Sequence, residues 1–349
     1  MKMIFGLMGI LLLLVGCQTA TSTDSSVQST STSSEQATSK SVVEATPTEA
    51  IQNPTPNPVQ ADWLAVDNFL YQLQRADPER IGNTAFDLAI LTISAAGNSP
   101  ETIPVLKKSE GGDKLILAYM SIGQAEEYRE YWQPEWADNP PAWLDEPDED
   151  WEGDYWVRYW DPDWQDIIYG SPESYLDRII ELGFDGVYLD RVDTYWYYED
   201  KENRETAAQE MVDFIMDFTA YARKQRPGFG VFPQNAEELG ILFPEYLDMM
   251  TGTGIEDLYY GNPRDHEASP AEWTAEREAI MDQWVAADKL VLTTDYTAKS
   301  EQIADAYQRA LARGYVEYVT DRSLGRLRIN KGFEPEKTPE QYDFSAVDD

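Results

Sequence analysis

Short apolar runs recur along the chain, and loops or helical patterns separate each run from the next. The runs are rich in Val, Ile, Leu, Tyr and Phe, residues that favour extended structure. They lie at Asp87–Ile93, Leu115–Ile122, Val157–Trp160, Gly186–Leu189, Gly228–Phe232, Asp248–Gly254, Lys289–Asp295 and Gly314–Thr320. The third run is short and the sixth is weak, but together they predict the strands of one sheet.

Apolar residues at helical spacing fill several of the gaps between these runs. Pro172–Leu182, Asn203–Lys224, Ala271–Ala287 and Ser300–Arg313 are predicted helices, and Ser300 is the expected N-cap of the last one. About eight strand–helix units are typical of a (β/α)8 TIM barrel. A doubly wound open sheet is the alternative, but no Gly-rich phosphate loop follows the first run.

The run Gly186–Leu189 carries the clearest functional signal. Gly183 precedes it as a predicted left-handed helix cap, and Asp190 and Asp193 follow it. Acids at the carboxyl end of a buried parallel strand are how α/β enzymes present catalytic groups. The alternative is a strand that ends at a solvated turn, where Asp is common.

The first 60 residues differ from the rest in composition. Residues 1–16 are a predicted signal peptide, because the apolar run after Lys2 is too short to span a bilayer. Leu14–Cys17 resembles the lipobox of bacterial lipoproteins, which implies a lipid on Cys17; an ordinary signal peptide is the alternative. Residues 17–60 are rich in Ser, Thr and Pro and are a predicted disordered tether.

These features predict one barrel domain over residues 61–349, outside the cytoplasm and anchored to the cell envelope. Gln18 follows the cysteine, so no Asp retains the protein at an inner membrane, which favours the outer leaflet or an outer membrane. Cys17 is the only cysteine, so the chain has no intramolecular disulfide.

The charge of the chain limits its partners. It has 27 Lys and Arg against 64 Asp and Glu, a net charge of −37. Such a surface repels nucleic acid and anionic lipid and attracts a cationic polymer. A surface adapted to salt or to solubility explains the same composition.

The residues that follow the predicted strands form a ring of acids, amides and aromatics. Aromatic faces stack on sugars, Asp and Asn bind hydroxyl groups, and two carboxylates across a cleft are the machinery of glycoside hydrolysis. In chain order the ring contains Thr92, Gln124, Trp160, Asp190, Asp193, Asn235, Glu256, Asp295, Tyr296, Asp321 and Arg322. The pattern therefore predicts a sugar site.

Other chemistry has less support in the sequence. His266 is the only histidine and lies in a polar loop, where a solvated residue is more common than a ligand. The chain therefore lacks a set of His ligands and a separate Ser–His or Cys–His pair. We expect no cofactor and no metal, although a calcium site made of Asp oxygens stays open.

Most of the barrel domain resembles glycoside-hydrolase family 114, the endo-α-1,4-polygalactosaminidase-like (β/α)8 proteins. The resemblance runs in order from about residue 70 to 328. The matching segments are Tyr71–Gln74, Ala118–Gly123, Tyr128–Trp132, Tyr159–Pro162, Gly183–Asp190, Pro233–Asn235, Gly254–Asp257, Thr294–Tyr296 and Tyr318–Asp321.

The resemblance implies a catalytic pair, an Asp after the fourth strand and a Glu after the sixth, which fall on Asp190 and Glu256. By likeness to α-galactosidase-type barrels, Asp190 is the expected nucleophile and Glu256 the acid/base of an endo-acting, retaining glycosidase. The implied substrate is an α-linked, partly deacetylated and therefore cationic galactosamine polymer. The residues expected to bind it are Tyr119, Gln124, Trp160, Asp193, Asn235, Asp295, Tyr296 and Asp321.

Two positions depart from the family pattern. Thr92 stands where the family usually has Asp, and Gln124 where it usually has Glu. Both changes remove a charge from the expected site but leave the implied catalytic pair. A surface lipoprotein that binds polysaccharide without cleaving it is therefore the main alternative, and an acid-lined metal-dependent enzyme is a third.

Overall fold

The structure is a computed structural model that describes residues 62–97 and 99–335. The chain divides into two compact units, 1–55 and 56–349, and the described residues belong to the second. The predicted signal peptide, the tether and Cys17 lie outside the described residues. In the part that is described, no helix combines the length and the apolar character needed to cross a membrane.

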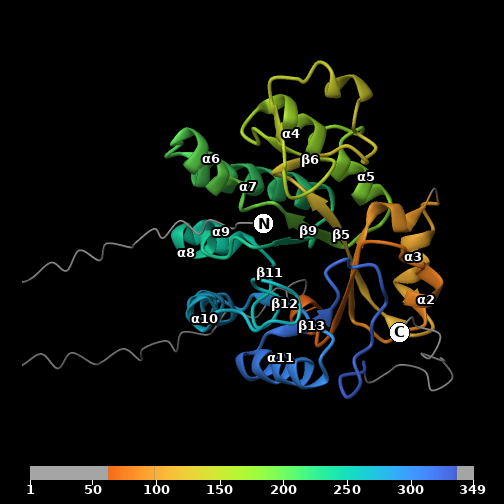
Figure 1. Cartoon of the computed structure of the whole chain (residues 1–349). Coiled ribbons are helices and arrows are strands. Elements are labelled where there is room, and N and C mark those ends of the chain that lie inside the picture. The colour runs from red at the N-terminus through yellow and green to blue at the C-terminus, as the bar shows by residue number, and fades with distance from the viewer. Residues whose placement is uncertain (1–61, 98, 336–349) are drawn as a thin grey trace, which may run out of the picture. The chain divides into compact units, whose positions relative to one another are not determined.

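Parallel strands form a closed barrel in the second unit (Figure 1). In chain order they are β1 (Phe69–Gln72), β2 (Leu88–Thr92), β5 (Leu115–Ser121), β9 (Gly186–Asp190), β10 (Gly230–Pro233), β11 (Gly252–Glu256), β12 (Leu290–Tyr296) and β13 (Val316–Thr320). A parallel bridge between Gln234 and Gly254 joins β10 to β11, and β13 lies beside β1. The predicted (β/α)8 barrel is confirmed.

One predicted strand is wrong, and one barrel strand was not predicted. Val157–Trp160 forms no barrel strand, because only Val157 is extended, as the last residue of β8 (Asp154–Val157). β8 pairs antiparallel with β6 (Gln124–Glu126) and β7 (Leu144–Pro147). These three strands belong to a long insert, residues 122–161, between β5 and the helices that precede β9. The true first strand, β1, has only four residues and ends in a polar one, so its apolar signal is short. The prediction added one strand before β9 and omitted another, so β9 and β11 are still the fourth and sixth barrel strands, as predicted.

The four predicted helices are present as α5 (Tyr175–Glu181), α7 (Ala207–Gln225), α10 (Ala271–Ala286) and α11 (Ser300–Arg313). Gly183 has the left-handed conformation expected after α5, with φ of 90°. Ser300 is not an N-cap, because α11 begins at this residue and Lys299 takes the cap position. The hydroxyl of Thr297 instead accepts the Lys299 N–H at 3.2 Å and holds the turn before the helix.

The remaining elements are short, and several lie in the loops that follow the barrel strands. They are α2 (Pro78–Gly82), η1 (Ile93–Ala96), α3 (Thr102–Leu106), β3 (Lys108–Ser109), β4 (Gly112–Asp113), η2 (Pro134–Ala137), α4 (Pro162–Ile168), α6 (Thr194–Glu202), α8 (Leu239–Leu242) and α9 (Pro244–Met249).

Tyrosines rather than aliphatic residues fill much of the barrel interior. Tyr71 and Tyr188 are buried and meet edge to face, with ring centroids 5.3 Å apart, and Tyr119 lies against Tyr71 at 6.5 Å. Gly254 on β11 makes room for the ring of Tyr188, because a Cβ there would lie 1.8 Å from the Tyr188 hydroxyl oxygen. The weak strand signal of β11 thus has a packing cause.

The amino end of β9 is fixed by Asp185, the residue before the strand. Its carboxylate accepts Lys107 Nζ at 2.5 Å, Arg226 Nη2 at 2.8 Å and the backbone N–H of Ile116 at 3.0 Å. The Asp185 side chain is only 10% exposed. Lys108 and Asp113 form a pair of the same length, 2.5 Å, on the surface.

The two pairs give a stability test. Asp185→Ala leaves two partly buried cations and a buried N–H without their acceptor, so we expect a loss of roughly 2–4 kcal/mol in the free energy of unfolding. Asp113→Ala breaks an exposed pair and should cost less than about 1 kcal/mol. Urea unfolding of both variants checks this, and equal losses would contradict the role of Asp185.

Candidate active site

Asp190 ends β9, and both of its carboxylate oxygens accept hydrogen bonds. The hydroxyl of Tyr119 donates to Oδ2 at 2.5 Å, and the backbone N–H of Arg191 donates to Oδ1 at 2.8 Å. The Asp190 carbonyl accepts the N–H of Ile122 at 3.1 Å. The parallel register brings Ser121 of β5 opposite Asp190. Backbone and side chain together fix the carboxylate at the carboxyl end of the barrel.

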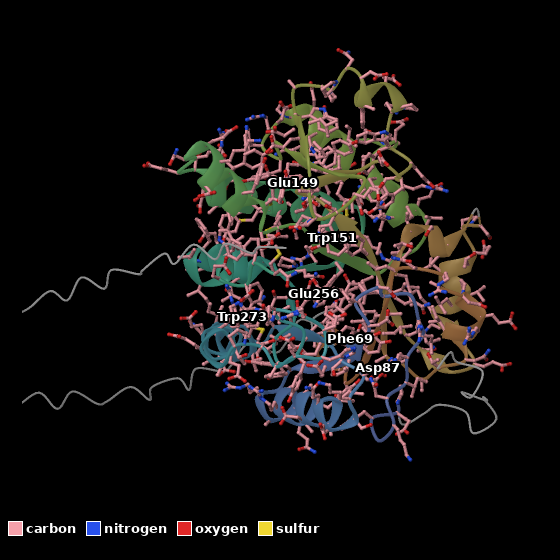
Figure 2. All side chains as sticks on the ribbon, viewed as in Figure 1. Phe69, Asp87, Glu149, Trp151, Glu256 and Trp273 are labelled. Carbon is pink, nitrogen blue, oxygen red and sulfur yellow. The ribbon has the colours of Figure 1, made fainter. Side chains whose placement is uncertain are left out.

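Glu256 ends β11 and receives three side-chain donors. Asn235 Nδ2 donates to Oε2 at 2.9 Å, Gln234 Nε2 donates to the same oxygen, and the Tyr296 hydroxyl donates to Oε1. Asn235 also accepts the backbone N–H of Glu256 at 3.0 Å, from a left-handed conformation that Asn tolerates. Gln234 in turn accepts the Tyr71 hydroxyl at 3.2 Å. Figure 2 labels Glu256 among the densely packed side chains at the middle of the barrel view.

The two carboxyls lie at the same end of the barrel, at the ends of the parallel strands β9 and β11. Burial raises the pKa of Glu256 to about 7, and the negative charges of Asp190 and Asp257 add to the rise. The hydrogen bonds from Tyr296 and Asn235 act in the opposite direction. Near neutral pH Glu256 therefore holds its proton part of the time, as a general acid must.

Arg322 organises the side of the site beyond Glu256. It binds Asp257 through two nitrogens, at 2.7 and 3.0 Å, and Asp265 through Nε at 2.7 Å. Its guanidinium lies 4.2 Å from the ring centroid of Tyr296. This stacking holds the ring whose hydroxyl donates to Glu256.

Several predicted site residues meet the pair. Tyr119 contacts Asp190, while Asn235 and Tyr296 contact Glu256. Asp193 follows Asp190 by one short turn. Burial raises the pKa of Asp193 to about 6, although the positive charge of Arg191 acts in the opposite direction. These residues form the centre of the candidate site.

Two more predicted residues follow barrel strands but bond to neither carboxyl of the pair. The amide of Gln124 donates 2.7 Å to Asp148 rather than to either carboxyl. Asp321, at the end of β13, accepts a hydrogen bond from the Ser323 hydroxyl. Thr92, the other departure from the family pattern, pairs with the hydroxyl of Ser94 at 2.7 Å. The side chains present at positions 92 and 124 therefore bond to Ser94 and Asp148 and not to Asp190 or Glu256.

The structure corrects two of the predicted positions. Asp295 is fully buried and accepts the backbone N–H groups of Tyr259 and Tyr260 at 2.8 and 2.9 Å. Successive side chains of a strand point to opposite faces, so Asp295 lies on the face opposite Tyr296. Its carboxylate holds the loop at Tyr259 and Tyr260 instead of facing a substrate. Trp160 is not at a barrel strand end; it lies against Tyr198, with the Arg204 guanidinium 3.7 Å from its ring centroid.

Sequence reasoning missed two residues that support the site, Tyr71 and Gln234, and the contact made by a third, Arg322. Tyr71 was overlooked because β1 was not recognised, although Tyr71–Gln74 was among the segments that match the family. Gln234 belongs to the matching segment Pro233–Asn235, but only Asn235 was predicted as a site residue. Arg322 was noted at the end of the last strand, but nothing in the sequence pairs it with Asp257.

The insert adds a second acidic group beside Asp190. Arg129 binds Glu126 through two nitrogens, at 2.6 and 2.8 Å. Burial and the charge of Glu126 raise the pKa of Asp154 to about 7, and Asp190 adds to this rise. Tyr128 is 63% exposed and donates to Asp154 at 3.2 Å. An exposed aromatic ring next to a carboxyl is suited to a sugar with polar substituents.

Metal-binding chemistry has little to build on in residues 62–97 and 99–335. In these ranges no three His, Cys, Asp or Glu side chains are grouped so that they could hold a metal ion. His266 is exposed, and its Nδ1 accepts the backbone N–H of Ala298 at 3.0 Å.

Solved structures share the fold of this domain. The glycoside hydrolase domain of PelA from Pseudomonas aeruginosa has a TM-score of 0.59 at 20% identity, over 76% of this chain and 99% of that chain. Ega3 of Aspergillus fumigatus, in complex with galactosamine, has a TM-score of 0.56 at 16% identity, over 75% of this chain and 95% of that chain.

Sequence relatives and a family model give the classification. An uncharacterized protein of Thermotoga maritima is 33% identical over 298 residues, 80% of this chain and 89% of that protein. One from Methanocaldococcus jannaschii is 38% identical over 276 residues, 74% of this chain and 77% of that protein. The model of glycoside-hydrolase family GH114 matches residues 46–334. This match covers most of the chain, and the chain therefore belongs to glycoside-hydrolase family GH114.

Proposed function

We propose that this glycosidase cleaves an α-linked, galactosamine-containing polysaccharide from within the polymer, with retention of configuration. The observation that carries the proposal is the contrast between two carboxyls at one end of the barrel. Asp190 has two fixed donors, while the pKa of Glu256 is raised to about 7. A pair of carboxyls in different environments can divide the roles of nucleophile and acid.

In the proposed reaction Asp190 attacks the anomeric carbon while Glu256 protonates the departing glycosidic oxygen. Glu256, now a carboxylate, then takes a proton from water, and the oxygen of that water displaces Asp190 from the sugar. This double displacement requires carboxyls about 5–5.5 Å apart, whereas an inverting pair stands about 6.5–9.5 Å apart. Tyr119 and the Arg191 N–H hold Asp190 for attack, and Asn235, Gln234 and Tyr296 hold Glu256.

The proposed substrate follows from charge and from likeness. Two guanidinium groups beside the site are engaged by other carboxylates: Arg191, which follows Asp190, by Asp148, and Arg322, which lies over Tyr296, by Asp257. Asp154 and Asp193 add carboxyls nearby. A sugar that carries an ammonium group would supply the missing positive charge, and Ega3, which shares this fold, was solved with galactosamine.

A polysaccharide-binding protein without activity is the second candidate, and Thr92 and Gln124 are the residues that favour it. Neither side chain bonds to Asp190 or Glu256; they bind Ser94 and Asp148 instead. Their lack of charge therefore leaves the hydrogen bonds of the catalytic pair intact, which supports the hydrolase over the binder.

Substitution of the pair tests the mechanism on partly deacetylated galactosamine polymer. Asp190→Asn should abolish turnover while folding and sugar binding persist. Glu256→Gln should lower kcat by about 10²–10⁴-fold, because the leaving group loses its acid. In the parent, kcat/KM should fall as the pH rises above about 7, where Glu256 loses its proton, and this limb should vanish in Glu256→Gln.

Release of reducing ends across the pH range is the measurement. Asp113→Ala, which breaks only the exposed Lys108–Asp113 pair of the β3–β4 hairpin, is the control expected to match the parent. Near-normal turnover by Asp190→Asn would contradict the assignment. Activity lost on chelation would instead favour metal-dependent chemistry.

The charge argument is tested by the acetylation of the substrate. We expect a lower KM on partly deacetylated than on fully N-acetylated polymer, with the difference shrinking as salt rises from about 0.02 to 0.5 M, since salt screens charge attraction. Equal use of both polymers at every ionic strength would limit the acidic surface to a role in solubility.

We further propose that the mature protein begins at a lipidated Cys17 and is held at the cell envelope, with the barrel domain outside the cytoplasm. The sequence Leu14–Cys17 and the Ser/Thr/Pro-rich stretch after it support this, and both lie outside the described residues. Intact mass of protein extracted from membranes should show a diacylglyceryl cysteine at the N-terminus. A mature terminus at another residue would overturn the proposal.

A further inference from the structure

The long insert reaches the catalytic end of the barrel through Asp148. Its side chain is 8% exposed, and one oxygen, Oδ2, accepts both Arg191 Nη2 and Gln124 Nε2 at 2.7 Å. The other oxygen, Oδ1, accepts the backbone N–H of Asp150 at 2.9 Å. Asp148 thus joins three parts of the chain: the loop between β7 and β8, the strand β6, and the residue that follows β9.

Arg191 matters because its backbone, not its side chain, contacts Asp190. Its N–H donates to Asp190 Oδ1 from a left-handed conformation with φ of 60°, which is unfavourable for a long side chain. Gly123 permits this turn, since a Cβ there would lie 2.1 Å from the Arg191 carbonyl oxygen. The guanidinium is held by Asp148 and lies 5.5 Å from the ring centroid of Trp156.

We propose that Asp148 is a positioning residue for the nucleophile. By holding the Arg191 side chain it stabilises the left-handed turn, and the turn directs the Arg191 N–H at Asp190. Asp148 does not touch the sugar or the reacting atoms. The proposal rests on the proposed function only in that Asp190 is the nucleophile. We call the contacts of Asp148 with Gln124 and Arg191 the clamp, and these contacts do not depend on the proposed function.

The same contacts explain why position 124 carries an amide. Gln124 donates a proton to the oxygen that also receives Arg191. A glutamate at this position would set one carboxylate against another in a buried site, and two such groups cannot both ionise without a large cost. Gln124 and Asp148 are therefore a matched amide–carboxylate pair, in which Gln124 is the donor.

The matched pair can be tested by swapping the amide and the carboxylate between positions 124 and 148. Gln124→Glu, Asp148→Asn and the double variant Gln124→Glu/Asp148→Asn are compared with the parent. The double variant again has one amide and one carboxylate, with their positions exchanged. Asp150→Asn is the control, because it removes an exposed carboxyl from the same loop but keeps the backbone N–H that donates to Asp148.

Kinetics on the polymer give the first measurement. Each single variant should lower kcat by about 10- to 100-fold with little change in KM, because the nucleophile is displaced while sugar contacts remain. In Gln124→Glu the loss should grow as the pH rises, because two carboxylates without a shared proton repel each other and neither can donate to the other. The double variant should recover to within about threefold of the parent.

Amide exchange gives a second measurement that needs no activity. With arginine labelled by ¹⁵N, the Arg191 amide is identified by its loss in Arg191→Lys, and its exchange with deuterium is followed by NMR. Exchange should be at least about tenfold faster in each single variant and near the parent rate in the double variant and in Asp150→Asn.

The outcomes separate the two ideas. Unchanged Arg191 exchange in both single variants, or a double variant no better than the worse single one, overturns the clamp even if the enzyme is active. A parent that cleaves no galactosamine polymer overturns the proposed function, while the exchange rates still decide whether Asp148 fixes the Arg191 turn.

Discussion

The electrostatic problem of placing two carboxyls at one end of a low-dielectric barrel governs the rest of this structure. Two full charges close together in a buried site are unfavourable, so the chain gives each carboxyl a different set of neighbours. Asp190 receives a phenol and a backbone N–H, while Glu256 is buried deeply enough to keep a proton near neutral pH. The tyrosine interior serves both, because a phenol donates a hydrogen bond without bringing a charge.

The supporting residues come from many separate elements. Tyr71 on β1, Tyr119 on β5 and Tyr296 on β12 converge on the pair, directly or through Gln234. Outside this layer, guanidinium groups hold the backbone and the aromatic rings: Arg322 stacks on Tyr296, and Arg191 ties the insert to the end of β9. The positive charges thus stay one layer away from the catalytic carboxyls.

Much of this arrangement was readable from sequence, and the limits have physical causes. Helices such as α7 and α11 were found because their apolar faces recur over many residues, and Asp190 was found because acids directly follow an apolar strand. β1 was missed because four residues carry too little periodicity. Val157–Trp160 was mistaken for a barrel strand because apolar residues in a small antiparallel sheet have the same local composition. Asp295 was placed at the site because it ends a predicted strand, and the position of a residue at a strand end does not say which face its side chain takes. Contacts between residues far apart in sequence, such as Arg322 with Asp257 or Gln124 with Asp148, produce no local pattern from which they could be predicted.

The tight fit of Tyr188 against Gly254 has a consequence for how this barrel can change over time. No side chain fits at position 254 while a tyrosine stands at position 188. A first substitution at either position alone would leave a clash or a void inside the barrel. We therefore expect the two positions to change together or not at all, so β11, whose sequence signal is weak, is tightly constrained by its packing.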